Sequence, residues 1–388
     1  MSGLAVPAGL RNPTGFIPQL ESLRGWAILL VIAFHYFGIL RDDSTGGLAA
    51  DSPLWLRLFG AGNTGVTLFF VLSGFLLTQP FIRAIRDGEH INIRQFYSAR
   101  LLRIIPLYYA AILVAWLITT NSTSAVKALL FIPVGFEIFP FSVPWWSLCT
   151  EVQFYLLLPW VMLALHYPRG RWLVAAGITA WLILHCIHLL QPQWLGLPPS
   201  SKSSLFGRGS AFLLGGLAGW FYISRGYAKV ASSPQILGLL ALLLLGALTW
   251  LLQWYGLTGQ NAALLAMPFY HDLEALIWAG LLLCSLGPLT LGLRAFINPL
   301  ASHFGTISYS LYLVHVPIQF YLIYPIKLVI GYTGALTDIR MLAAVAGSFM
   351  LSWLLAVLCY HCIERPFLRL KSHLPVLTGK QREAPAKA

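Results

Sequence analysis

Long apolar stretches alternate with short polar connections along almost the whole chain. A transmembrane helix needs about 20 mostly apolar residues to cross the hydrocarbon core of a bilayer. The connections are mostly short, which leaves no room between the stretches for a folded soluble domain. The pattern predicts an all-α, polytopic membrane bundle of about ten transmembrane helices. The apolar stretches lie at 21–40, 61–80, 101–119, 145–166, 171–191, 206–223, 235–254, 272–291, 306–328 and 340–362.

The composition supports the same prediction. Of the 388 residues, 58% are hydrophobic and only 10% are charged, whereas a soluble domain carries roughly 25% charged residues. We expect one transmembrane domain at 21–368, preceded by a cytoplasmic segment at 1–20. The polar residues 369–388, which include prolines, are expected to form a disordered cytoplasmic tail. No internal repeat is evident of the kind that would indicate the matching halves of many transporters.

The formal net charge of +12 suggests a nucleic-acid partner, but the positions of the basic residues argue against it. Lysine and arginine concentrate at 83–103, in the final residues, and in the other connections that ten spans place on the side of both termini. This bias follows the positive-inside rule. We therefore predict a multi-pass protein of the inner (cytoplasmic) membrane, embedded in the lipid bilayer with both termini in the cytoplasm. Nucleic acid is not an expected partner.

The first predicted span contains an arginine and a histidine, Arg24 and His35. They are eleven residues apart, close to three helical turns, so both side chains project from one helix face about 16 Å apart. An ionisable group at mid-bilayer costs about 2.5–3.5 kcal/mol and usually faces the bundle interior, where it has a function. These two residues also disfavour a cleaved signal peptide. Taken alone, His35 could equally be a structural histidine between helices.

Glu151, in the fourth span, lies at a depth that would allow it to meet His35. Both residues fall in the outer half of the membrane when successive spans alternate in direction. A carboxylate beside an imidazole fixes its tautomer and stabilises its protonated form, which is the usual support of a general base. The sequence predicts a catalytic pair of His35 and Glu151. The alternative is a buried ion pair that only joins two helices.

Two further arginines, Arg100 and Arg103, mark the cytoplasmic start of the third span. At a spacing of i, i+3 they are neighbours on one helix face. Guanidinium groups bind phosphate oxygens bidentately, although the positive-inside rule alone also places arginines at such ends. With Arg24, they could hold a ligand with a phosphate-bearing head and a long thin arm that presents its tip to His35. Coenzyme A thioesters have this shape.

The remaining candidates are on the ninth and second spans. Tyr309, Tyr312 and His315 are expected to contact substrate or to pack within the bundle. Ser73 precedes a glycine and is expected to serve close helix packing more than nucleophilic attack. The five cysteines fall in or beside apolar spans without zinc or disulfide spacing, so we expect them to be packing residues. No metal is expected.

In combination, these segments resemble the acyltransferase 3 family of bacterial integral-membrane O-acyltransferases. A lone Arg-x10-His spacing would be weak evidence, but the segments follow the order of the family and cover almost the whole chain. They are Arg24-x10-His35 within LESLRGWAILLVIAFH, FFVLSGFLLT at 69–78, Arg100-x-x-Arg103, WWSLCTEVQFY at 145–155, SYSLYLVHVP at 308–317 and IERPF at 363–367.

The resemblance implies transfer of an acyl group, commonly acetyl, from cytoplasmic acyl-CoA to a hydroxyl of a carbohydrate-containing acceptor. Such acceptors include polysaccharides, glycolipids and macrolide sugars. His35 and Glu151 match the family's catalytic histidine and carboxylate. The matched arginines Arg24, Arg100 and Arg103 are implicated in donor binding. Many members carry an SGNH-type domain after the last span, and we expect the compact form without it.

A transporter is the alternative function. In a proton-coupled transporter or flippase of a lipid-linked or small polar solute, His35 and Glu151 would form a proton relay and no thioester would be needed. The sequence does not indicate the acceptor, the acyl chain length or the formation of an acyl-enzyme. It also leaves open whether the protein forms a homo-oligomer.

Overall fold

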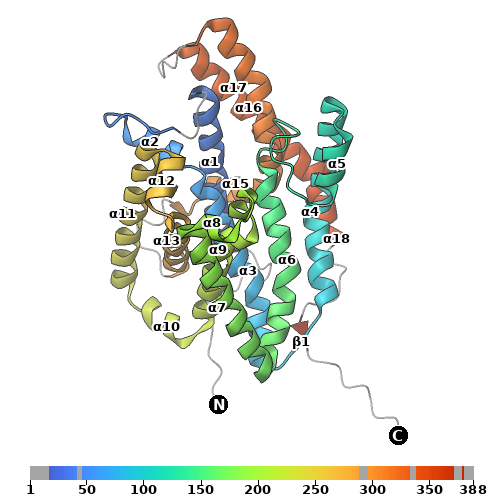
Figure 1. The fold of residues 1–388 in the computed structure, drawn as a ribbon, viewed down its shortest axis with the longest axis vertical. Helices are drawn as coiled ribbons and strands as arrows, with labels where there is room; N and C mark the ends of the chain where they lie inside the picture. Colours follow the sequence, from blue (N-terminus) through green and yellow to red (C-terminus); the bar gives the residue numbers. More distant parts are fainter. Residues whose placement is uncertain (1–16, 42–45, 288–295, 333–337, 371–377, 380–388) are drawn as a thin grey trace.

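A computed structural model describes residues 17–41, 46–287, 296–332, 338–370 and 378–379. Within these residues the protein is a bundle of packed helices (Figure 1). Eight helices in the described part of the chain are long and apolar enough to cross a membrane. They are α1 (Pro18–Arg41), α3 (Thr64–Asp87), α4 (Ile93–Thr119), α6 (Trp145–His166), α7 (Pro168–Leu190), α11 (Pro234–Thr258), α16 (Ser308–Ile330) and the continuous helix Ile339–Leu370.

The other two predicted spans are also helices, α9 (Leu205–Ile223) and α13 (Tyr270–Ser285). Helix α13 has only 16 residues, and the glycine-rich α9 contains a charged residue, Arg208. Both pack against α3, and α9 stacks its Phe212 ring on Phe70 with centroids 4.6 Å apart. All ten predicted spans coincide with helices, which confirms the all-α membrane bundle. Part of the eighth span, 288–291, lies outside the described residues.

Short elements connect the long helices. They are α2 (Leu54–Gly60), β1 (His90–Ile91), α5 (Ser122–Leu129), α8 (Pro192–Leu195), η2 (Pro199–Ser203), α10 (Arg225–Ala231), α12 (Gln260–Ala266), α15 (Pro299–Thr306) and β2 (Thr378–Gly379). The two strands pair antiparallel. In Figure 1, α10 and β1 lie towards one end of the bundle, and α2, α5 and α12 lie towards the other. Connections therefore alternate between two ends, as ten crossings require.

The last long helix is divided into three parts: α17 (Ile339–Cys359), the π-helical turn η3 (Tyr360–Glu364) and α18 (Arg365–Leu370). A π-helical turn within an α-helix often marks a functional site. The predicted tail at 369–388 is described only at its first two residues and at β2, where Thr378–Gly379 pairs with β1.

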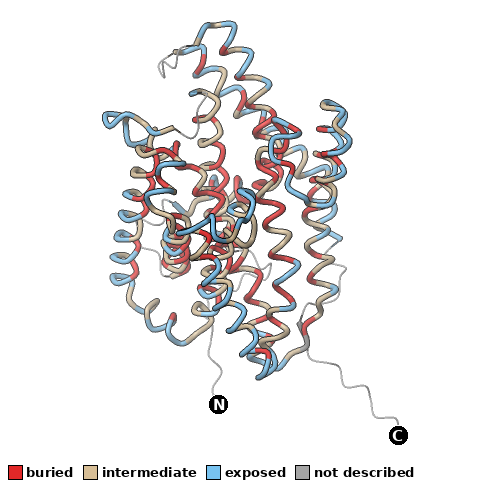
Figure 2. The backbone as a smooth tube through the Cα atoms, viewed as in Figure 1, coloured by how far each residue is buried: buried red, intermediate tan, exposed pale blue. Residues whose placement is uncertain are grey.

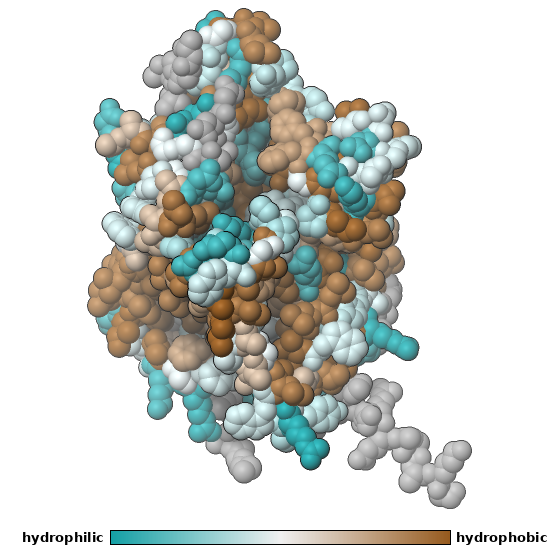
Figure 3. Space-filling model, in the orientation of Figure 1, coloured by the Kyte–Doolittle hydropathy of each residue, from teal (hydrophilic) through white to brown (hydrophobic). Residues whose placement is uncertain are grey.

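Burial separates the inner helices from the outer ones (Figure 2). In α3, 72% of the most apolar window is buried, whereas in α7 the share is 11%. Helix α7 instead exposes large apolar side chains such as Trp172 and Leu173. Figure 3 shows hydrophobic side chains gathered in a band across the face in view, with hydrophilic ones projecting below it. This is the surface that a lipid-embedded bundle requires, because lipid replaces water around its outer helices.

Helix α15 packs very closely against the start of α1. A Cβ atom on Gly25 would lie 1.9 Å from the carbonyl oxygen of Ala301, and one on Gly305 would lie 1.9 Å from that of Glu21. Small residues allow such backbone contact in membrane bundles. The hydroxyls of Ser22 and Ser302 share a hydrogen bond of 3.0 Å across the same contact. The position of Arg24 is therefore set by backbone packing on both sides of it.

The start of α4 differs from the predicted span. The apolar stretch begins at 101, but the helix begins eight residues earlier, at Ile93. Asn92 caps it, because its side-chain oxygen accepts a hydrogen bond of 3.1 Å from the backbone N–H of Gln95. Arg100 and Arg103 consequently lie inside a regular helix, with their side chains on neighbouring positions of one face.

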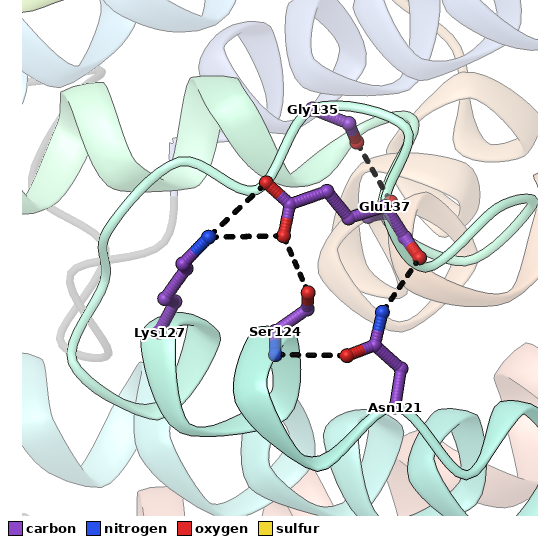
Figure 4. Close-up of polar contacts among 6 residues, drawn as sticks. Asn121, Ser124, Lys127, Gly135 and Glu137 are labelled. Atoms are coloured by element: carbon purple, nitrogen blue, oxygen red, sulfur yellow. Dashed lines mark hydrogen bonds and ion pairs between the residues drawn. The ribbon is translucent and has the colours of Figure 1, made fainter.

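The connection from α5 to α6 is held by one carboxylate, Glu137 (Figure 4). Its side chain accepts hydrogen bonds from the Ser124 hydroxyl and from Lys127 Nζ, the latter at 3.2 and 3.3 Å. Its backbone carbonyl accepts from Asn121 Nδ2 at 3.2 Å. These contacts attach the connection to both ends of α5 and give the segment 121–144 a defined conformation at the end of the bundle.

Replacement of Glu137 by glutamine is expected to lower the melting temperature slightly at pH 7. The hydrogen bond from Ser124, and then Lys127, hold the pKa of the Glu137 carboxyl below its usual value. A carboxyl with a lowered folded-state pKa stabilises the fold above its unfolded pKa and loses this effect as the pH falls through the folded one. Thermal unfolding of wild type and variant should therefore differ at pH 7 and converge only as the pH falls below about 4. A difference that persists at acidic pH would contradict this assignment.

Candidate active site

A cavity of about 400 Å³ lies between α1, α3, α4, α6 and α16. One part of its wall is apolar, with leucine, valine, isoleucine and phenylalanine side chains from α3, α4 and α6. The other part is unusually polar for the interior of a membrane bundle. Its polar members are Glu21, Arg24, Ser73, Arg100, Arg103, Ser147, Glu151, Tyr155, Ser308, Tyr309 and Tyr312.

Arg24 reaches this cavity from α1. Its guanidinium donates a hydrogen bond of 3.2 Å to Ser308 Oγ at the start of α16 and lies 3.6 Å from the carboxylate of Glu21, one turn earlier. The Arg24 side chain is only 14% exposed. The arginine that the sequence analysis placed on the His35 face therefore points into the bundle and towards a hollow, where it is available to a ligand.

Arg100 and Arg103 line the same cavity from α4. The guanidinium of Arg100 lies over the rings of Phe96, at 5.6 Å, and Tyr155, at 6.0 Å, in cation–π contacts. Its Nε atom is buried and donates no hydrogen bond to any group in the described part of the chain. Buried donors are nearly always satisfied in folded proteins. This donor is therefore a good candidate to bind a ligand group that enters the cavity.

Glu151 faces these arginines from α6. Its carboxylate accepts a hydrogen bond of 2.7 Å from Ser73 Oγ and another from the Tyr155 hydroxyl, one turn further along α6. It also interacts electrostatically with Arg24, Arg100 and Arg103. Ser73, predicted to serve helix packing, also bonds through its hydroxyl to the carboxylate that lines the cavity.

The two tyrosines of the ninth span line the cavity and connect α16 to its neighbours. Tyr309 donates a hydrogen bond of 2.7 Å to the carbonyl of Ile104 in α4. Tyr312 bonds to the carbonyl of Pro144 at 2.9 Å and to the hydroxyl of Ser147, both at the start of α6. Their hydroxyls are thus occupied by protein groups, and their rings remain as part of the wall.

His35 and His315 form a pair beside this wall and do not line the cavity as it stands. His315 Nε2 lies 3.2 Å from His35 Nδ1, and the ring centroids are 4.9 Å apart. The His315 ring in turn lies 5.9 Å from the cavity-lining ring of Tyr312. Among the described residues, no hydrogen bond or ion pair joins His35 to Glu151. The His35 imidazole therefore contacts a second histidine, His315, whereas the sequence predicts a contact with the carboxylate of Glu151.

Sequence reasoning missed three polar groups around the cavity. Glu21 precedes Arg24 by three residues and Tyr155 follows Glu151 by four, so helical spacing alone could have shown both. Glu364 lies in the π-helical turn η3, is 4% exposed and accepts a hydrogen bond of 2.8 Å from Ser310. Its carboxyl interacts electrostatically with Arg24 and Arg103. Only its place in the IERPF segment indicated that it belongs here.

No cluster of three or more histidine, cysteine, aspartate or glutamate residues suited to a metal occurs in the described ranges. All five cysteines are free in this structure. The cavity offers three guanidinium donors, two carboxylates and several hydroxyls beside an apolar wall, with a pair of imidazoles next to it.

Comparisons with known proteins agree on one family. The acyltransferase 3 model, described as an acyltransferase domain, matches residues 17–361. The acyltransferase MdmB of Streptomyces mycarofaciens is 30% identical over 205 residues, which cover 48% of this chain and 49% of that protein. The O-acetyltransferase OatA of Staphylococcus aureus is 28% identical over 167 residues, covering 38% and 25% of the two chains.

The peptidoglycan O-acetyltransferase OatA of Listeria monocytogenes is 26% identical over 165 residues, which cover 37% of this chain and 24% of that protein. The chain thus matches about half of one curated relative and about a quarter of the other two. No solved structure matches it. Because the family model extends from residue 17 to residue 361 and includes every residue that lines the cavity, the chain belongs to the acyltransferase 3 family.

Proposed function

We propose that this protein is a membrane-embedded O-acyltransferase that moves an acyl group, in the first instance acetyl, from acyl-CoA to a hydroxyl of a carbohydrate-containing acceptor. Family membership and the O-acetyltransferases among its relatives support the reaction type. The observation that carries the donor assignment is the cavity wall, where three arginines face an apolar surface. A thioester of coenzyme A needs both the arginines and the apolar surface, because it joins phosphates to a long uncharged arm.

The size of the cavity limits which part of the donor it holds. Its volume of about 400 Å³ is at the lower end of ordinary small-molecule sites. We therefore assign the pantetheine arm to the apolar wall and the nearest phosphates to Arg24, Arg100 and Arg103. The thioester then lies at the Tyr312 side of the cavity, next to the histidine pair. The nucleotide end of the donor then extends beyond the cavity.

The orientation follows from the distribution of basic residues. The connections rich in lysine and arginine, including the one that leads into α4, belong on the cytoplasmic side of the inner membrane. Arg100 and Arg103 follow the start of α4 by seven and ten residues, about 10–15 Å along the helix axis. Cytoplasmic acyl-CoA would therefore meet these arginines in the half of the membrane that faces it, with both chain termini on the same side.

In the proposed reaction, His35 acts as general base. Its imidazole takes the proton of the acceptor hydroxyl, the acceptor oxygen forms a bond to the thioester carbonyl carbon, and the C–S bond breaks. The thiolate of coenzyme A then takes the proton from the His35 imidazolium and leaves as thiol. Glu151 holds Ser73 and Tyr155 in place and offsets the positive charge of the arginines.

Labelled acetyl-CoA tests this function directly. The purified protein in lipid nanodiscs is incubated with acetyl-CoA labelled on the acetyl group, alone and with a panel of oligosaccharides, peptidoglycan fragments and macrolide glycosides. Transfer of label, or hydrolysis of the thioester, supports the enzyme. The transporter would replace the enzyme as the proposed function if acetyl-CoA stays intact with every acceptor and the protein takes up a polar solute into proteoliposomes in a proton-dependent way.

Arg100→Ala is expected to raise the KM for acyl-CoA about 10- to 100-fold with a smaller effect on kcat. The reason is that hydrogen bonds to charged groups contribute about 1.5–3 kcal/mol, and the unpaired Nε of Arg100 is the donor available to the ligand. Initial rates against acyl-CoA concentration measure the effect. Arg94→Ala is the matched control, since Arg94 is an exposed arginine six residues earlier in α4. An equal change in KM in both variants would mean that Arg100 serves only the orientation of the protein in the membrane and does not bind the donor.

A further inference from the structure

The contact between His35 and His315 determines where the protons of both rings lie. His35 Nδ1 is 2.8 Å from the carbonyl oxygen of Val31, and His315 Nδ1 is 3.0 Å from that of Leu311. A carbonyl oxygen only accepts hydrogen bonds, so each Nδ1 must carry the proton that it donates. In a neutral ring the other nitrogen, Nε2, is then an acceptor with a free lone pair.

The distance between the rings is consistent with this arrangement. His315 Nε2, the acceptor of its ring, lies 3.2 Å from His35 Nδ1. The His35 Nδ1–H is thus shared between Val31 O and His315 Nε2, and both rings can be neutral with every contact a proper donor–acceptor pair. The chain of bonds runs from His35 Nδ1 to His315 and from His315 Nδ1 to Leu311 O. It leaves one ring atom, His35 Nε2, as the unprotonated nitrogen that a general base needs.

We propose that His315 is a positioning residue that holds His35 in the tautomer with Nε2 free. This inference rests on the proposed function, in which His35 is the general base, and adds the group that supports it. When His35 takes the acceptor proton on Nε2, its Nδ1–H remains bonded to the neutral His315 Nε2, which stabilises the imidazolium. The proton passes on to the departing thiolate, so the pair returns to its starting state. His315 thereby takes the part that a carboxylate has in a serine hydrolase triad.

The surroundings of His315 fit a positioning role better than substrate contact. His315 is fully buried, with 0% exposure. Its ring lies 5.9 Å from that of Tyr312, which lines the cavity, whereas His315 itself does not. Other polar contacts join the same two helices, from Gln319 Nε2 to Ile32 O at 3.4 Å and from Lys327 Nζ to Ile39 O at 2.8 Å. These contacts set the register of α16 on α1, so that the two imidazoles meet in a constant geometry.

The tautomer can be measured without turnover. In 15N-histidine-labelled protein in micelles, the His35 signals are assigned by their absence in His35→Gln. We expect wild type to show His35 with a protonated Nδ1 and an unprotonated Nε2. In His315→Phe, which removes the acceptor, the population with a protonated Nε2 should rise. Wild-type protein with a predominantly protonated His35 Nε2, or a His35 spectrum unchanged in the variant, would overturn the proposal.

Kinetics separate positioning from a purely structural role. His315→Phe is expected to lower kcat on the order of 10- to 100-fold, the range found when a supporting partner of a functional histidine is removed. The KM for acyl-CoA should stay unchanged, because His315 does not line the cavity. His315→Gln keeps an acceptor oxygen near the same place and should recover much of kcat. His303→Gln, at an exposed histidine of α15, is the control and should behave as wild type.

The two proposals fail in different ways. Wild-type protein that leaves acetyl-CoA intact with every acceptor would end the proposed function, while the 15N spectrum would still decide the tautomer. Active wild-type protein whose kcat is the same in His315→Phe would end the positioning role and leave the acyltransferase in place. If His315→Phe does not fold, the wild-type spectrum and the His315→Gln rates decide the question by themselves.

Discussion

His35→Ala is expected to lower kcat by about 10²- to 10⁴-fold, the contribution typical of a positioned general base. The KM for acyl-CoA should stay near the wild-type value, because His35 does not line the cavity assigned to the donor. The physical reason is that an alcohol with its proton attached is a weak nucleophile, and the alanine variant lacks the imidazole that would take this proton. Initial rates with labelled acetyl-CoA and a saturating acceptor measure the loss.

This experiment needs a stability control, since His35 also bonds to Val31 O and His315. Size-exclusion elution and the melting temperature of His35→Ala should stay close to those of wild type. His166→Ala is the matched variant, because His166 is an exposed histidine at the end of α6, away from the cavity-lining residues. It should keep full activity. A folded His35→Ala protein with wild-type kcat would remove His35 from the reaction.

Glu151→Gln is expected to reduce kcat/KM for acyl-CoA by about 10²-fold or more. Glutamine has nearly the same shape and can still accept the hydrogen bonds of Ser73 and Tyr155 through its side-chain oxygen. It removes the negative charge that interacts with Arg24, Arg100 and Arg103, so these guanidinium groups repel one another and move. A displacement of about 1 Å at a reacting centre can cost about 10²-fold in rate.

The control for Glu151→Gln is the same substitution at a glutamate that does not line the cavity. Glu89→Gln alters the connection between α3 and β1 and should leave both kcat and KM unchanged. Glu151→Asp keeps the charge but shortens the side chain, so it should retain more activity than the glutamine variant. If Glu151→Gln retains wild-type kcat/KM, the carboxylate is only a packing partner of Ser73 and Tyr155, and its place in the proposed mechanism is lost.

The membrane architecture could be predicted from the sequence because it depends on local properties. A run of about 20 apolar residues is long enough to span a bilayer whatever its neighbours are, and all ten such runs coincide with helices. The helix ends were predicted less well, as at α4, which continues through polar residues to the Asn92 cap. Hydropathy detects the part of a helix that lies in lipid, and the rest depends on capping and on contacts outside it.

The sequence by itself also indicated several of the polar groups inside the bundle and predicted roughly how deep each one lies. Depth follows from residue number, because a helix rises about 1.5 Å per residue. Arg24, Arg100, Arg103 and Glu151 were identified in this way, and they line one cavity.

Only the tertiary structure decided which of these groups touch. Two side chains at one depth meet only if their helices are rotated towards each other, and packing sets that rotation through contacts such as that of Gly25 with the backbone of α15. The structure accordingly directs Glu151 to Ser73 and Tyr155, and pairs His35 with His315. Residue spacing gives the position of a side chain along its own helix and the helix face on which it lies. The side chain that it contacts on another helix is fixed by packing alone.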